Sequence, residues 1–167
     1  MSGVLQALGG KVKRITTATI AICIANAASP DGLRAIQHIN CAAYAELRRL
    51  PLKRIEGASR ANADADRVRD AHMAEALELG APLVESNSGF PGLARPRSVG
   101  GSAAVGIGYF FGSVVTVEQD RFEGKHGVAP TSGRSLDARF EQLAHWYRIR
   151  ATEMTSRYEV EGCADLF

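Results

Sequence analysis

The feature that most constrains this chain is an uncharged stretch of twenty residues, Ser98 to Val117, with the sequence SVGGSAAVGIGYFFGSVVTV. As an α-helix this stretch would extend about 30 Å, which is the thickness of the hydrocarbon core of a bilayer. Charged residues flank it on both sides, beginning with Arg97 and Glu118. Because lipid offers the backbone no hydrogen bonds, a single crossing segment must be helical. The stretch therefore predicts a transmembrane helix over residues 98–117 in a mainly α-helical chain.

Small residues recur at every fourth position of this stretch, at Gly100, Ala104, Gly108 and Gly112. In a helix they form one stripe, which lets a second helix approach closely. The stripe predicts a helix-packing surface. Near the middle of a membrane span, the hydroxyl of Tyr109 would need a partner. The large apolar residues beside the stripe are then expected to face lipid or further partners: Ile107, Phe110, Phe111, Val114 and Val115.

Two other interpretations of the same stretch stay open. Glycine and serine make it only moderately hydrophobic, and the β-branched run from Val114 to Val117 suits a strand. It is therefore also compatible with a glycine-rich strand pair in an α+β domain. The run GIGYFFG from Gly106 to Gly112 is close to a dinucleotide-binding fingerprint, but that motif needs a preceding strand and an acidic residue about 20 positions later. The nucleotide-binding interpretation is the least favoured, because neither requirement is met.

The first thirty residues contain three basic residues and no acid, and an apolar run follows from Ile15 to Ala25. This pattern is typical of a secretory signal, with small residues around Ala27 for cleavage, or of a mitochondrial presequence. A retained anchor and an ordinary first helix are the alternatives. Residues 1–30 are accordingly predicted to be a basic, presequence-like or anchor segment.

Two helices are predicted between residues 31 and 80. The sequence Ser29-Pro30-Asp31 favours a helix start, and Pro51 favours an end near Leu50. The second helix is expected from Ala58 to Leu79, with Gly80 as its C-terminal stop. Proline and glycine then predict a loop over residues 81–97.

The last predicted element is an amphipathic helix over residues 135–160, after a loop over residues 118–134. Ser135 favours its start. Its apolar face is formed by Leu136, Phe140, Leu143, Tyr147 and Met154, at steps of three, four or seven residues. This face predicts a helix that docks on a partner, and packing on the protein's own helices is the alternative.

No pattern in the sequence indicates chemistry. The three cysteines, Cys23, Cys41 and Cys163, are odd in number and widely spaced, which indicates neither a zinc site nor a disulfide framework. We therefore expect buried or idle thiols. His38 would share a helix face with Cys41, but no second pair of ligands lies nearby in the sequence. His72 is expected to be a surface or partner contact. We predict no catalytic residue, metal or cofactor, and interspersed charges with a net charge of +2 argue against nucleic-acid binding.

This layout resembles the small single-span accessory subunits of mitochondrial respiratory-chain complexes and ATP synthase. The resemblance rests on the acid-free basic N-terminus, on Arg97, on the run from Ala103 to Gly112, and on the charged stretch that follows. It implies a non-catalytic subunit of the mitochondrial inner membrane, paired through Gly108 and Gly112. Its partners would be the lipid bilayer and other protein subunits of a membrane complex. The glycine-containing segment 124–133 departs from the family pattern, so no particular subunit is assigned. A soluble or exported α+β binding domain without enzymatic activity is the alternative.

Overall fold

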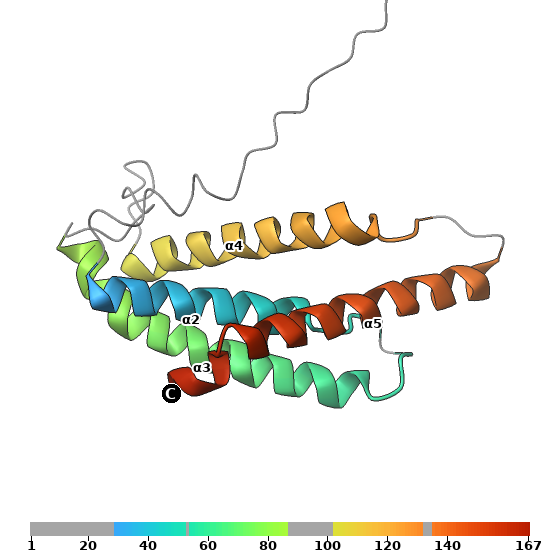
Figure 1. The fold of residues 1–167 in the computed structure, drawn as a ribbon, viewed down its shortest axis with the longest axis horizontal. Helices are drawn as coiled ribbons and strands as arrows, with labels where there is room; N and C mark the ends of the chain where they lie inside the picture. Colours follow the sequence, from blue (N-terminus) through green and yellow to red (C-terminus); the bar gives the residue numbers. More distant parts are fainter. Residues whose placement is uncertain (1–28, 53, 87–101, 132–134) are drawn as a thin grey trace, which may run out of the picture.

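The computed structural model describes residues 29–52, 54–86, 102–131 and 135–167 (Figure 1). These residues form the α-helices α2 (Pro30–Leu47), α3 (Ala58–Glu85), α4 (Ala103–His126) and α5 (Leu136–Val160), followed by the 3-10 helix η1 (Cys163–Leu166). The prediction of a mainly α-helical chain is confirmed. The α+β alternative is wrong for the described part of the chain, which contains no strand. The presequence-like segment up to residue 28, most of the predicted loop 81–97, and Gly100 lie outside the described residues.

Helix α2 is the central helix of the molecule and contacts α3, α4, α5 and η1 (Figure 1). It is buried around most of its circumference, as a helix surrounded by others must be. The helix begins as predicted, because the Ser29 hydroxyl accepts a hydrogen bond from the amide of Gly32 at 3.1 Å and Pro30 occupies the first turn. Its small side chains allow close approach on several sides: Ala35, Ala42, Ala43 and Ala45 have no exposed surface.

Helix α3 does not stop at Gly80 as predicted but continues to Glu85. Gly80 is buried inside the helix, and Pro82 lies within the last turn. The residues beyond Gly80 include Leu83, which packs against a cluster that contains Ile39 of α2. This tertiary packing outweighs the weak helix propensity of glycine and proline.

Helix α4 passes through the charged residues that were expected to begin a loop and ends at His126, before Gly127, where the backbone takes a positive φ of 84°. Glu118 is 7% exposed and accepts a hydrogen bond from Arg157 of α5 at 2.7 Å. One turn later, Phe122 is completely buried against the ring of Trp146. The prediction of a loop over residues 118–134 is therefore wrong up to His126, because these side chains bind α4 to α5.

The large apolar residues that the sequence analysis placed beside the small-residue stripe face the protein's own helices. Ile107 is completely buried, and Phe110, Phe111 and Val114 pack around it with residues of α2 and α3. The expectation that these residues face lipid is wrong. Within the described residues, no helix combines the length and the apolar character that a bilayer crossing requires. The predicted span over residues 98–117 therefore has no support from the described helices.

Candidate functional site

One face of α4 is exposed and carries no charge. We define this α4 outer face as the exposed residues Ala104, Val105, Gly108, Tyr109, Gly112, Ser113, Thr116 and Val117. The predicted small-residue stripe lies on it, except for Gly100, which is outside the described residues. A Cβ atom added at Gly108 or Gly112 would find nothing within 4 Å. The described part of the chain therefore places no side chain over this stripe.

Two hydroxyl groups of the α4 outer face already form hydrogen bonds within their own helix. The Ser113 hydroxyl donates to the carbonyl oxygen of Tyr109 at 3.1 Å, and the Thr116 hydroxyl donates to that of Gly112 at 3.0 Å. The Tyr109 hydroxyl was expected to need a partner near the middle of a membrane span, and the residue is 74% exposed at the surface of α4. Val105 and Val117 add apolar area on the same face. The face is thus a largely apolar surface with the exposed side chain of Tyr109 near its middle.

The apolar face of α5 is used mostly within the protein. Met154 is completely buried in a cluster with residues of α2 and α4, and Tyr147 packs against that cluster. Phe140 packs on a second cluster formed around Ile55, and Leu143 is half-buried. Among the five residues predicted to dock a partner, only Leu136, which is 84% exposed, stays at the surface.

Cys41 of α2 and Cys163 of η1 form a disulfide across a sequence separation of 122 residues. Both residues are buried. The prediction of idle thiols is wrong for this pair, because the fold brings together two residues that no local pattern connects. Cys23 lies outside the described residues.

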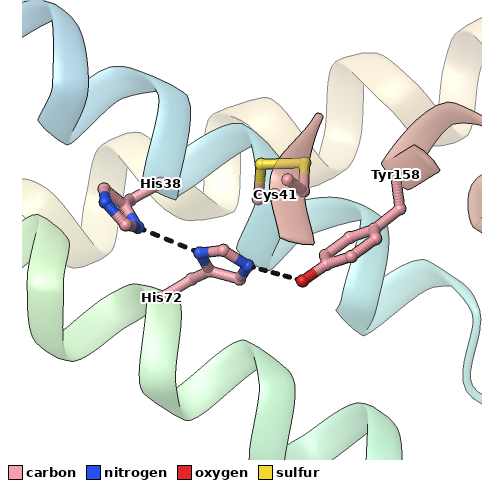
Figure 2. Close-up of a disulfide and its surroundings, with 5 residues drawn as sticks. His38, Cys41, His72 and Tyr158 are labelled. Carbon is pink, nitrogen blue, oxygen red and sulfur yellow. Dashed lines mark hydrogen bonds between the residues drawn. A yellow bond between two sulfur atoms is a disulfide. The ribbon is translucent and has the colours of Figure 1, made fainter. Parts of the chain in front are cut away.

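Close to the disulfide, a chain of hydrogen bonds links three helices (Figure 2). The Nδ1 atoms of His38 and His72 are 2.9 Å apart, and Nε2 of His72 is 2.8 Å from the hydroxyl of Tyr158. Both histidines have no exposed surface, so the prediction of His72 as a surface or partner contact is wrong. One Nδ1 must donate and the other accept, and in either arrangement the buried Nε2 of His38 has no hydrogen-bond partner among the described residues.

The surroundings of the pair favour neutral imidazoles. Burial lowers the pKa of His72 to about 4, and the neighbouring His38 and Arg48 act in the same direction. Burial also lowers the pKa of His38, which Glu75 partly opposes. The ring of Phe167 lies 4.6 Å from that of His72, centre to centre. Both rings are therefore uncharged at neutral pH and enclosed by apolar and aromatic groups.

The histidine pair is not accompanied by further ligands. Over the described ranges, no group of three or more histidine, cysteine or acidic side chains is placed to hold a metal ion. The sequence pattern placed His38 and Cys41 on one face of α2, which is where they lie (Figure 2). Their partners, His72 and Cys163, come from other elements and carry no signal in the sequence. Comparison of the chain with known protein families, with curated proteins and with solved structures finds no match.

Proposed function

We propose that this chain is a non-catalytic accessory protein that packs the α4 outer face against a helix of a larger partner protein. The observation that carries this proposal is the uncharged, exposed face itself, which is open at both Gly108 and Gly112. From Ala104 to Val117 the face extends about 20 Å along the helix, enough for several turns of a partner helix.

The chemistry of the α4 outer face favours a helix as the partner. Glycines at four-residue spacing let two helix backbones approach until weak Cα–H contacts form along their length. The hydroxyls of Ser113 and Thr116 donate hydrogen bonds to carbonyl oxygens of their own helix. A partner helix can therefore cover these two side chains without leaving either hydroxyl unpaired. Tyr109 supplies a large, amphipathic side chain of the kind that is enriched at protein interfaces.

We place this role in an oxidising compartment. A disulfide such as Cys41–Cys163 forms and persists in secreted, periplasmic and similar environments and is rare in the cytosol. The secretory interpretation of residues 1–30 leads to such a compartment. A subunit of the mitochondrial inner membrane is a narrower form of the same proposal, with membrane-complex subunits and lipid as partners. Carbonate extraction of membranes tests that form, since a protein released by alkali is not anchored by a span.

The proposal is tested by comparing two glycine variants of the same helix. Gly108→Leu fills the centre of the α4 outer face, whereas Gly124→Leu adds the same side chain at an exposed position outside it, where there is also nothing within 4 Å of the added Cβ. Leucine has a better helix propensity than glycine by up to about 1 kcal/mol, so neither variant should unfold. We expect Gly108→Leu to reduce recovery of the co-purified partner at least about tenfold. Gly124→Leu should leave recovery unchanged.

A photo-crosslinking residue at Tyr109 identifies the partner directly, because this side chain lies within the proposed contact. Thermal unfolding of both glycine variants provides the control for folding. Equal recovery of the partner with Gly108→Leu and Gly124→Leu would mean that the α4 outer face is ordinary solvent-exposed surface, and the proposed function would then be rejected.

A further inference from the structure

The His38–His72 contact joins α3 to the part of α2 that is covalently linked to the C-terminal segment. We define this C-terminal segment as Tyr158 to Phe167, which ends α5 and includes η1. Tyr158 bonds to Nε2 of His72, and the ring of Phe167 packs on both imidazoles, with centre-to-centre distances of 4.6 Å to His72 and 5.6 Å to His38. The segment therefore covers the histidine pair from the side of α5 and η1.

The closed arrangement is compatible with neutral imidazoles and not with two protonated ones. In the neutral pair, one Nδ1–H donates to the bare Nδ1 of the other ring across 2.9 Å. When both rings are protonated, each Nδ1 carries a hydrogen, so the hydrogen bond is lost and two positive charges face each other. Protonation also places a buried N–H at Nε2 of His38, for which the described part of the chain offers no acceptor.

We propose that the His38–His72 pair is an acid-operated latch, which holds the C-terminal segment on α3 while both rings are neutral and releases it when the pair takes up protons. Phe167, whose ring packs on both imidazoles, is itself 66% exposed, so the pair is covered on that side by a group at the surface. This inference is independent of the proposed function, since it involves neither the α4 outer face nor a partner.

The charged groups around the pair do not offset the positive charge that the imidazoles gain when they are protonated. Arg34 of α2 disfavours the charged form of His38, and Arg48, which caps the C-terminus of α2, disfavours that of His72. On α3, only Glu75 favours a charge on His38. On α5 the facing group is Tyr158, a neutral phenol whose pKa is raised by burial. In η1 the exposed acid is Asp165, and the nearest acid that α4 turns toward α2, Glu118, acts on Tyr44. The charged groups around the two histidines therefore disfavour their protonated forms more than they favour them.

Two contacts remain in place when the C-terminal segment is released from α3. The Cys41–Cys163 disulfide keeps η1 attached to α2 whatever the state of the histidines. At the start of α3, the Asn62 side chain accepts from the amide of Leu50 and donates to its carbonyl oxygen, at 2.7 and 2.9 Å. Neither feature titrates between pH 7.5 and 4.5, so η1 stays tethered to α2, α3 stays bonded to the backbone of Leu50, and the release of the C-terminal segment from α3 is reversible.

The test is amide hydrogen exchange of the intact, disulfide-bonded chain from pH 7.5 to 4.5, corrected for the intrinsic pH dependence of exchange, together with NMR titration of ¹⁵N-labelled histidines. We expect exchange in the C-terminal segment to rise at least about tenfold by pH 4.5, while α4 changes less than about twofold. His72→Gln keeps a polar group beside Tyr158 but cannot take up a proton, so it should abolish the rise. His145→Gln, a matched change at an exposed histidine of α5, should preserve it.

Three results would overturn the latch. One is exchange in the C-terminal segment that does not change with pH. Another is the same rise in His72→Gln, which would assign the effect to other groups. The third is a titration in which His38 and His72 take up protons independently at the ordinary histidine pKa of 6.5. If His72→Gln does not fold, the exchange and titration of the unmodified chain decide the question without it.

Discussion

Removal of the Cys41–Cys163 disulfide is expected to lower the free energy of unfolding by about 5 kcal/mol. The bond closes a loop with a sequence separation of 122 residues. In the chain-entropy account, a cross-link over such a loop removes about 16 cal/mol/K from the unfolded chain, which corresponds to about 5 kcal/mol at 25 °C. Such a loss is a large fraction of the roughly 5–15 kcal/mol by which a domain of this kind is stable.

The perturbation is the double variant Cys41→Ala/Cys163→Ala, made in a Cys23→Ala background so that no other thiol interferes. The oxidised parent with Cys23→Ala alone, which keeps the Cys41–Cys163 bond, is the reference. The same parent after reduction is the control that lacks the bond but keeps both cysteines. Urea denaturation should give a midpoint at least about 2 M lower for the double variant, given slopes of 1–3 kcal/mol/M. Peptide mapping of the parent should recover Cys41 linked to Cys163. A loss of less than about 1 kcal/mol would refute the reasoning, because it would show that the bond does not restrict the unfolded chain or hold η1 on α2.

Two further outcomes can be measured by the same denaturation assay. Between pH 7.5 and 4.5 the free energy of unfolding should fall by about 2–3 kcal/mol, because His72 has a pKa of about 4 when folded and binds protons near 6.5 when unfolded. Its stabilising contribution is therefore complete above pH 6.5 and is lost as the pH falls toward 4; an equal fall in His72→Gln would contradict this. Met154→Ala should lose about 2–5 kcal/mol because Met154 is completely buried. Leu136→Ala, at a residue that is 84% exposed, should change stability by less than about 0.5 kcal/mol, and equal losses would mean that the inner and outer faces of α5 are misassigned.

Local signals predicted the helix starts well. Ser29 caps α2, and the Ser135 hydroxyl caps α5 by accepting from the amide of Ala138 at 3.1 Å. Both depend on neighbours in the sequence, which is why they are readable without a structure. The helix ends were harder to predict, because burial of Gly80 and the bond between Glu118 and Arg157 extend α3 and α4 beyond their local stop signals.

The residues of a helix do not by themselves determine what the helix packs against. The uncharged stretch ending at Val117 indicated a helix correctly for the part that is described, but the same side chains suit a lipid bilayer and the inside of a bundle. What decided the environment of Ile107 was the alanine-rich surface of α2, which lies far away in the sequence. The histidine chain escaped prediction for the same reason, since His38, His72 and Tyr158 come from different helices.

The separation of Cys41 and Cys163 also orders events during synthesis. A chain made from its N-terminus presents Cys23 and Cys41 to an oxidant long before Cys163 emerges, so the Cys41–Cys163 bond can form only after residues 41–163 have been synthesised. Until then the only thiol available to Cys41 within the same molecule is Cys23. Cleavage after Ala27, which the secretory interpretation of residues 1–30 implies, would remove Cys23 and leave Cys41 and Cys163 as the two cysteines of the sequence.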